Sequence, residues 1–424
     1  MAQTWYAARR GGLILLGVAA LVTVAAVARH LLTPSLEVLA PRGAEIADYV
    51  GSARCAECHR EMTEHQSRSR MAATLQTAEE FESGHSLPVP AELLDPDNHL
   101  RYRIDRRDGK LFLEVWRGRE VARAEMTYAL GSGKVAVTFV RDLDADNYQE
   151  LRASWYADTN AWDLTPGQRG ARPVSVTEAL GRPIGKRSPQ ACLTCHASLL
   201  VQSDAEIDPA RSRFGVGCER CHGPGRAHIE SVATGRATVA VTKIRPPALD
   251  EALALAQRLR EGRRAETPQD ELLRSVAQVN DERLVYDLYV CGECHGYDQI
   301  WNKPSDDNLV KFQVAALVGS RCYERSQRKI RCTDCHDPHG DSSPDDVGAA
   351  VAVCLKCHQD PATSVADGVP SPPLATDDTP QQLKVCPVNA RDGCVGCHMP
   401  IRSPMLHARM THHRIAIYGH REAK

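Results

Sequence analysis

Aromatic side chains are scarce in this sequence. Phe, Trp and Tyr together account for 5% of the 424 residues, whereas hydrophobic residues as a whole account for 42%. Aromatic rings supply much of the buried area of a protein core, so the chain has poor material for a large core of its own. Its hydrophobic content is nevertheless too high for a wholly disordered protein. We therefore expect a folded chain, and the length suggests two or three domains.

An excess of charge of either sign is also missing. The 52 Lys and Arg residues nearly balance the 54 Asp and Glu residues, which leaves a formal net charge of −2. Proteins that bind nucleic acid through a basic surface depend on a large positive excess. We therefore do not expect nucleic acid as a partner.

Long hydrophobic runs are absent beyond the N-terminal region. One uncharged run of 18 residues covers 11–28, and Arg9 and Arg10 precede it. This pattern predicts export, through a membrane anchor or a cleaved signal. We favour an anchor over residues 1–33 that places the rest of the chain on the periplasmic side of the inner membrane. The small residues at 26–28 also fit a cleavage site, and cleavage would leave a periplasmic or extracellular protein.

Cysteine and histidine, in contrast, are abundant, with 16 Cys and 17 His. Fourteen of the cysteines form seven C-x-x-C pairs, and a His directly follows each pair. Numbered in chain order, motifs 1 to 7 are Cys55/Cys58/His59, Cys192/Cys195/His196, Cys218/Cys221/His222, Cys291/Cys294/His295, Cys332/Cys335/His336, Cys354/Cys357/His358 and Cys394/Cys397/His398.

The spacing within each motif suits covalent attachment of haem. Two thiols three positions apart are neighbours on one helical turn, where they can add to the two vinyl groups of one porphyrin. The adjacent imidazole then binds the iron. Zinc ribbons need paired knuckles and have no use for a constant following His, and a disulfide framework does not need the His at all. We therefore predict seven covalently bound haem c groups with the motif histidines as proximal iron ligands.

Two cysteines lie outside the motifs. In an oxidising compartment Cys322 and Cys386 can form one disulfide between the regions of haems 5 and 7. Two free buried thiols are the alternative, because the sequence does not give their separation.

Enough histidines remain to supply a second ligand to most of the irons. His30 lies at the predicted membrane edge, which leaves nine others. His228 follows the turn Gly223-Pro224-Gly225, and His339 follows Pro338, which ends the motif helix. We favour these two as distal ligands. Bis-His coordination lowers the potential of a haem relative to His/Met coordination.

Other candidates for distal ligands are weaker. We expect one of the neighbours His412 and His413 to bind an iron, because both cannot face the same ring. His65, His407 and the thioether of Met71 are further candidates, with Met71 as a packing residue as the alternative. His85 and His99 lie in polar, turn-rich sequence and are not expected to bind iron.

The motifs are unevenly distributed along the chain. We expect a first haem-binding segment at 34–100, a β-containing insertion at 101–180 and a six-haem domain at 181–424. Within the insertion, residues 111–116, 134–140 and 150–156 have the alternation or β-branched content of strands. The expected fold is mainly α, with little regular structure around stacked haems and a small antiparallel β insertion.

The motifs and their flanks resemble a known family. Similar stretches are 49–55, 215–225, Ser320-Arg321-Cys322-Tyr323, 335–339 and Cys397-His398-Met399-Pro400. Because of these stretches, residues 49–424 resemble the exported multihaem c-type cytochromes, a group related to the tetrahaem cytochromes of nitrifying bacteria and the octahaem reductases. The resemblance implies stacked haem pairs, periplasmic electron transfer and distal ligands at His228 and His339. Where the family commonly has a His near the first motif, this chain has Arg70 beside Met71.

Two functions are compatible with these features. The first is electron transfer by a membrane-tethered heptahaem cytochrome, from a quinol-side donor to a periplasmic or extracellular acceptor. The second is reduction or oxidation of a small nitrogen or sulfur compound at one iron with an open face, with Tyr102, Tyr156 or His85 as proton donor. We favour electron transfer and assign no catalytic residue. The sequence leaves oligomerisation open.

Overall fold

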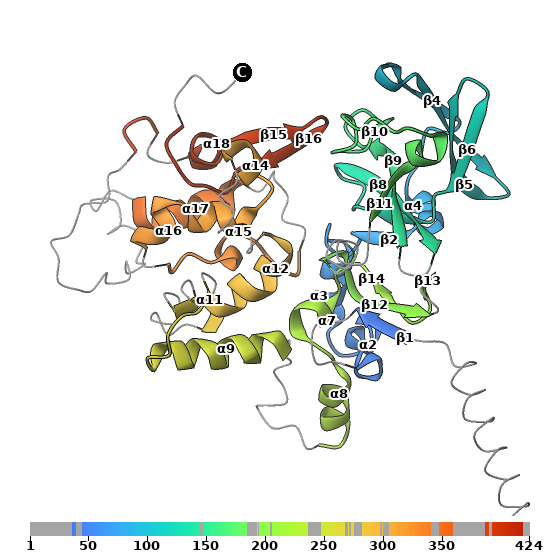
Figure 1. Ribbon diagram of the computed structural model, residues 1–424. Helices are drawn as coiled ribbons and strands as arrows, with labels where there is room; N and C mark the ends of the chain where they lie inside the picture. The colour runs from blue at the N-terminus through green and yellow to red at the C-terminus, as the bar shows by residue number, and fades with distance from the viewer. Residues whose placement is uncertain are drawn as a thin grey trace, which may run out of the picture.

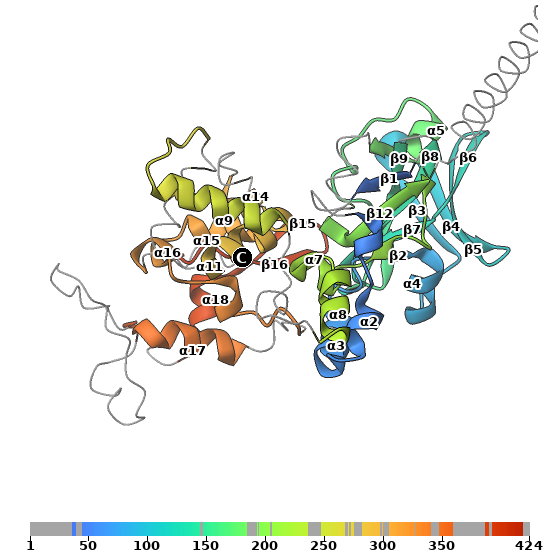
Figure 2. The same ribbon diagram turned by 90° about the horizontal axis from the view of Figure 1, so that it is seen from below.

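Figure 1 shows the computed structural model of the chain. It describes residues 36–39, 45–144, 147–184, 193, 195–203, 206–235, 247–267, 270, 273–274, 282–296, 299, 305–326, 328–340, 347–358, 386–389 and 392–418. Antiparallel sheets from residues 75–184 lie on one side, and the short helices of residues 247–418 lie on the other (Figures 1 and 2). We call these the β lobe and the helical lobe. Residues 36–74 and 193–235 form a connecting region below the β lobe in Figure 1.

The β lobe contains two antiparallel sheets. The larger has the strand order β10-β9-β8-β7-β2, with β11 also paired to β9, and the smaller has the order β3-β4-β5-β6. The strands of the larger sheet are β2 Leu75–Thr77, β7 Tyr128–Leu130, β8 Ala136–Asp144, β9 Asn147–Tyr156, β10 Ala161–Leu164 and β11 Gly181–Ile184. Those of the smaller sheet are β3 Ala91–Asp95, β4 Leu100–Arg107, β5 Lys110–Arg117 and β6 Glu120–Glu125.

Buried and outward-facing side chains alternate along the strands of the smaller sheet. In β4, Leu100, Tyr102 and Ile104 are buried, while the residues between them face outward. A two-residue turn, Asp108-Gly109, joins β4 to β5, and both residues have positive φ (50° and 79°). Turns of this kind match the right-handed twist of the two strands.

One hydrophobic core fills the space between these elements. It includes side chains from both sheets and from α4 (Ala78–Gly84), which begins with a capping box between Thr77 and Glu80. Its fully buried large members include Phe81, Tyr102, Ile104, Leu113, Phe139 and Leu151. The β lobe therefore has a protein core of its own.

The expectation of a mainly α fold with a small β insertion needs correction. The expected strands at 111–116 and 150–156 lie within β5 and β9, and the one expected at 134–140 overlaps β8, which begins at Ala136. However, β1 (Leu36–Leu39) and β2 precede residue 101, and strands also form at 91–107 and at 197–214. Strands such as β3, β4 and β6 place charged residues on their outer face, so each shows a short hydrophobic alternation that is easily missed.

The connecting region combines short strands with the first haem motifs. Its sheet consists of β1 Leu36–Leu39, β12 Ala197–Ser203, β13 Glu206–Ile207 and β14 Arg213–Phe214. Its helices are η1 Ile46–Asp48, α2 Ser52–Ala56, α3 Arg60–Ser67, α7 Cys218–His222 and α8 Arg226–Ala233.

The helical lobe has short helices and much irregular chain. Its elements are α9 Pro247–Arg260, α11 Glu282–Tyr286, η3 Asp287–Cys291, α12 Gly292–Cys294, α14 Asp306–Leu309, α15 Gln313–Val318, α16 Arg321–Arg325, η4 Cys332–Asp334, α17 Val347–His358, α18 Cys394–His398, β15 Ile401–Met405 and β16 Ala408–Thr411. A small apolar cluster joins α9 to α11, η3 and α15, with Leu249, Leu259, Leu284 and Val314 among its members. Most of these helices are one or two turns long, which agrees with the expectation of little regular structure around the motifs.

The apolar run at 11–28 lies outside the described residues. Among the residues that are described, no helix combines the length and hydrophobicity needed to cross a bilayer.

A buried ion pair joins the two sheets of the β lobe. Nη2 of Arg152, on β9, lies 2.8 Å from Oδ2 of Asp95, at the end of β3, and the two side chains are 2% and 3% exposed. Nδ2 of Asn98 donates to the same carboxylate oxygen at 2.8 Å. The pair therefore fixes the position of one sheet relative to the other.

We expect Asp95→Asn to lower the free energy of unfolding by about 3 kcal/mol, because it leaves the Arg152 guanidinium buried without its counter-charge. Urea unfolding of the holoprotein followed by far-UV circular dichroism measures the change. Asp97→Asn is the control, since Asp97 and its partner Arg172 are 70% and 62% exposed and such pairs contribute less than about 1 kcal/mol. Equal effects of the two substitutions would contradict the assignment.

Candidate haem-binding sites

Each described motif folds as about one turn of helix. In motifs 1, 4 and 5, the backbone N–H of the His donates to the carbonyl oxygen of the first Cys, at 2.8, 3.0 and 2.9 Å. Motifs 3 and 7 form helices α7 and α18 from end to end, and motif 6 is the last turn of α17. In motif 2, Cys195 and His196 are described, whereas Cys192 lies outside the described residues. The expected helical turn, with sulfurs and imidazole on adjacent positions, is therefore present.

The two cysteines of a motif are not equally enclosed. In motifs 1, 5, 6 and 7 the first cysteine is half-buried, whereas the second is exposed, namely Cys58, Cys335, Cys357 and Cys397. This difference in exposure is shared by the four motifs. Its physical reason is that the protein packs against the first cysteine of each turn, as the sulfur contacts below show, and the second lies on the outer side of the turn. Haem attachment at these four exposed cysteines stays a prediction from the motif spacing.

Hydrogen bonds orient several of the motif imidazoles. Nδ1 of His196 lies 3.0 Å from the carbonyl oxygen of Thr74, and Nδ1 of His398 lies 2.9 Å from that of Ala416. Nδ1 of His295 lies 3.2 Å from Oε1 of Gln313. A carbonyl partner requires the proton on Nδ1, which leaves Nε2 as the nitrogen that can bind a metal. The donor set therefore fits an iron ligand.

Three motif histidines face a second imidazole from elsewhere in the chain. The ring centroids of His59 and His228 are 6.5 Å apart, those of His222 and His339 are 5.9 Å apart, and those of His336 and His413 are 6.0 Å apart. A metal–imidazole nitrogen bond of about 2 Å, plus roughly 1 Å from nitrogen to ring centre, puts two axial imidazoles about 6 Å apart. Each pair therefore has the spacing of two axial ligands to one iron.

Burial keeps these imidazoles in the form that binds metal. It lowers the pKa values of His196, His222 and His336. Burial, together with the neighbouring His336, lowers the pKa of His413 to about 4. All four are therefore neutral at pH 7, as metal coordination requires.

The neighbours His412 and His413 have different surroundings. Nδ1 of His413 lies 3.0 Å from the carbonyl oxygen of Thr411, which leaves Nε2 for a metal. Nδ1 of His412 instead accepts the backbone N–H of Arg414 at 3.1 Å. That bond places the proton of a neutral His412 on Nε2, so the geometry favours His413 as the ligand.

The remaining candidates lie in other environments. His407 is at the tip of the β15–β16 hairpin, where its two nitrogens lie 3.5 Å from Asp158 and 3.4 Å from Asp163 of the β lobe. His65 is exposed on α3. Met71 is half-buried, and its carbonyl oxygen accepts the N–H groups of Thr74 and Val216. The structure does not bring these three together with a described motif histidine.

The two histidines that we did not expect to bind iron belong to the β lobe. The ring of His85 stacks on Phe81 with centroids 4.1 Å apart, and His99 follows η2 (Pro96–Asn98) with a positive φ of 53°.

Sulfur atoms from different motifs are in contact. The thiols of Cys55 and Cys218 lie next to each other, which brings motifs 1 and 3 together. Corresponding contacts join motifs 2 and 4, motifs 4 and 5, and motifs 6 and 7, through Cys195 and Cys294, Cys291 and Cys332, and Cys354 and Cys394. If each motif binds haem as its spacing predicts, these sulfurs would be thioether sulfurs, and the contacts would bring neighbouring haem attachment points together.

The two variable residues of motif 3 are buried and charged. Glu219 is 4% exposed and accepts backbone N–H groups next to motif 1, and Arg220 is 8% exposed. Nη2 of Arg220 lies 3.1 Å from Glu293 and 3.9 Å from the sulfur of Cys294, both in motif 4. Sequence reasoning missed both residues, because variable positions of such a motif are usually solvated.

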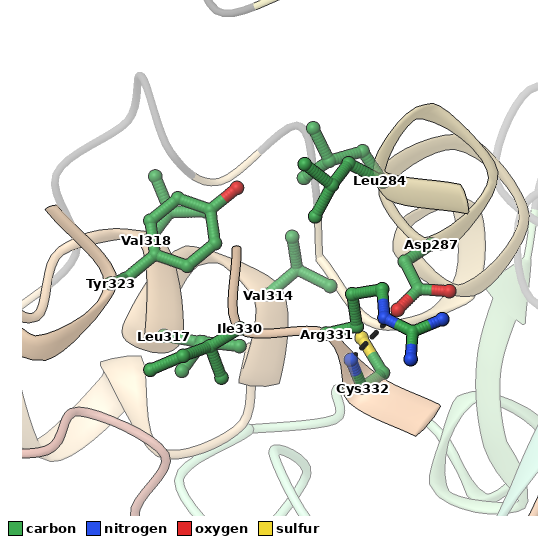
Figure 3. Close-up of a pocket in the computed structure, with 10 residues that line it drawn as sticks. Leu284, Asp287, Val314, Leu317, Val318, Tyr323, Ile330, Arg331 and Cys332 are labelled. Carbon is green, nitrogen blue, oxygen red and sulfur yellow. Dashed lines mark hydrogen bonds between the residues drawn. The ribbon is translucent and has the colours of Figure 1, made fainter. Parts of the chain in front are cut away.

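A second buried carboxylate links motifs 4 and 5. Asp287 begins η3, which ends at Cys291, and it accepts the backbone N–H of Cys332 at 2.8 Å (Figure 3). Burial raises the pKa of Asp287. The contact lies at one end of a small pocket whose apolar lining includes Leu284, Val314 and Tyr323.

An open cleft of about 670 Å³ lies beside motifs 1 and 3. Its lining includes Ser52 and Gly217, which precede Cys55 and Cys218, and Arg213. A guanidinium is suited to bidentate pairing with carboxylates such as haem propionates. The lining also includes Glu80 and Glu219, so its size is compatible with part of a porphyrin, while Arg213 is the one cationic side chain among the described lining residues.

No disulfide joins Cys322 to Cys386 in the described part of the chain, where both are free thiols. Cys322 lies close enough to Cys357 of motif 6 that the two thiols influence each other electrostatically. Among the described residues, no group of three or more His, Cys, Asp or Glu side chains forms a conventional metal cluster.

Comparison with known families gives two partial matches. The family model of the doubled CXXCH motif matches residues 326–363, which contain motifs 5 and 6. That of cytochrome c554 and c-prime matches residues 153–223, which contain motifs 2 and 3 and the end of the β lobe.

No curated protein matches the chain significantly. Among solved structures, that of the outer cell wall cytochrome OcwA is similar over 44% of this chain and 34% of the OcwA chain, with 18% identity and a TM-score of 0.27. The chain thus matches about a third of the length of OcwA. From the motifs and the two family matches, the chain is a multihaem c-type cytochrome with covalently bound haem c.

Proposed function

We propose that this protein is a heptahaem c-type cytochrome that transfers electrons outside the cytoplasmic membrane. The observation that carries the proposal is the set of contacts between motifs. A thioether sulfur is two bonds away from the porphyrin ring, so two sulfurs in contact hold two porphyrin edges only a few bond lengths apart. Such spacing favours direct electron exchange between haems.

The contacts support a continuous series of haems. Direct sulfur contacts link motifs 1 and 3, motifs 4 and 5, and motifs 6 and 7. Arg220 links motif 3 to motif 4, and we place motif 6 next to motif 5 because Cys335 influences Cys354 electrostatically. Motif 2 joins the series at motif 4, through Cys195 and Cys294. In the proposed series, haems 1 and 7 are therefore the two ends.

Axial ligation also favours transfer over catalysis. We propose bis-His coordination by His59/His228 at haem 1, His222/His339 at haem 3 and His336/His413 at haem 5. An iron with two imidazole ligands has no open position for a substrate, and this ligand set favours low potentials. His65, Met71 and His407 remain candidates for the other irons.

The location and the partners are proposed from the N-terminal region. Residues 1–33 have the pattern of an anchor or signal, and export fits a protein that carries haem through thioether bonds. An anchored form would receive electrons from a quinol-side donor at the inner membrane and pass them to a periplasmic or extracellular redox protein.

The purified protein should contain seven haems per chain in a pyridine haemochrome assay. Its oxidised form should give electron paramagnetic resonance signals of low-spin haem, and film voltammetry should show reversible low-potential waves. Nitrite or hydroxylamine should produce no catalytic current, because the proposed function needs no open iron. Fewer than seven haems would contradict the proposed cofactor content. A high-spin component with catalytic current would favour the oxidoreductase alternative.

His413→Ala should convert one haem per chain from low-spin to high-spin and let it bind CO when reduced, because the iron of haem 5 loses its proposed distal ligand. His412→Ala is the matched control, since this neighbour uses its Nδ1 as an acceptor for Arg414. Paramagnetic resonance and CO difference spectra of both variants measure the change at equal haem content. The opposite outcome, with a new CO site only in His412→Ala, would assign the ligand to His412.

A further inference from the structure

The carboxylate of Glu219 accepts three backbone N–H groups from two distant segments. Its Oε1 accepts from Val50 at 2.9 Å and from Gly225 at 2.8 Å, and its Oε2 accepts from Gly51 at 2.7 Å. The residue lies between the two cysteines of motif 3 and is 4% exposed. Hydrogen bonds to an ionised carboxylate are about twice as strong as neutral ones, so this contact is a strong local constraint.

The three N–H groups belong to the segments on either side of haem 1. Gly51 is the N-cap of α2, which carries Cys55 and leads to His59. Gly225 is the N-cap of α8, which carries His228. One carboxylate therefore holds both the start of the proximal segment and the start of the distal helix.

The segments approach each other closely at this point. A Cβ on Gly225 would lie 3.0 Å from Cγ2 of Val50 and 3.3 Å from Oε1 of Glu219. Gly51 has a positive φ of 82°, a conformation that other residues rarely adopt. The contact is therefore built for close approach of the two segments.

Acidic residues at variable positions of other motifs have different partners. Glu57 in motif 1 and Glu293 in motif 4 each have 55% of the side chain exposed, and they pair with Arg54 and Arg220. Asp334 in motif 5 is 22% exposed and pairs with its neighbour Arg331. Of these four carboxylates, Glu219 is the most buried, and it joins two segments that are far apart in the sequence.

We infer that Glu219 is a positioning residue for haem 1, which holds His59 and His228 at the separation that one iron needs. This inference rests on the proposed bis-His ligation of haem 1. The motif that attaches haem 3 thereby sets the axial geometry of haem 1. This is a second link between the two motifs, in addition to the contact between the sulfurs of Cys55 and Cys218. Glu219 touches no iron itself and acts through the two helices.

The test compares Glu219→Gln with the control Glu57→Gln in the full-length holoprotein. Gln keeps the shape but must turn an NH₂ group toward one of the N–H donors, so the contact is weakened. We expect seven haems in both variants. In Glu219→Gln, reduced haem should bind CO at one site per chain at least about tenfold more tightly than in the wild type, the loss expected from a charge-assisted hydrogen bond. Glu57→Gln should match the wild type.

A second substitution identifies the haem that is affected. His228→Ala alone should open one CO site per chain, and adding Glu219→Gln should open no further site if Glu219 acts through His228. Additional opening in the double variant would overturn the inference, as would wild-type CO binding in Glu219→Gln. If Glu219→Gln does not assemble, Gly225→Ala disturbs the same contact from the other side and should give the same single CO site, and wild-type CO binding there would overturn the inference.

These outcomes separate the inference from the proposed function. A wild-type protein without low-spin bis-His signals would refute the proposed ligation, whatever the variants do. A wild-type protein with those signals, combined with an unaffected haem 1 in Glu219→Gln, would refute only the role of Glu219.

Discussion

The single helical turn of each C-x-x-C-H motif is the constraint on which the rest of this structure depends. The bond from the His amide to the first Cys carbonyl, seen at His59, His295 and His336, places two sulfurs and one imidazole on adjacent positions. A porphyrin attached there is fixed in both position and tilt. The protein then needs only to place the turns near one another, which explains why the helical lobe has short helices and a small apolar cluster.

Buried carboxylates are one of the means by which the turns are placed. Glu219 joins motif 3 to the chain before motif 1, and Asp287 joins motif 4 to the first amide of motif 5. The β lobe contributes in another way, because Asp158 and Asp163 flank His407 at the tip of the β15–β16 hairpin. The same hairpin leads to His413, so the β lobe is connected to the surroundings of His336 in motif 5. Figures 1 and 2 show the hairpin between the two lobes.

Local patterns could be predicted from the sequence, whereas long-range partners could not. The motifs and their helical turns could be predicted because each depends on residue types within a stretch of five residues. The three strands at 111–116, 134–140 and 150–156 follow from alternation, but the extent of the β lobe does not, because the outward faces of β4 and β6 are largely polar. His228 lies six residues after His222, yet its ring faces His59, which belongs to a different motif. Its partner is set by the packing of α8 against the chain before α2, and no local signal encodes that packing. Glu219 was missed for the same reason.

Motif 4 differs from the others in the number of its neighbours. It touches motif 2 through Cys294, motif 5 through Cys291 and motif 3 through Arg220. In an electron-transfer chain such a place is a three-way junction. Damage to motif 2 would remove a side branch and leave the route between the two ends intact. Loss of motif 4 would leave three isolated parts, whereas loss of any other internal motif of the proposed series would leave two.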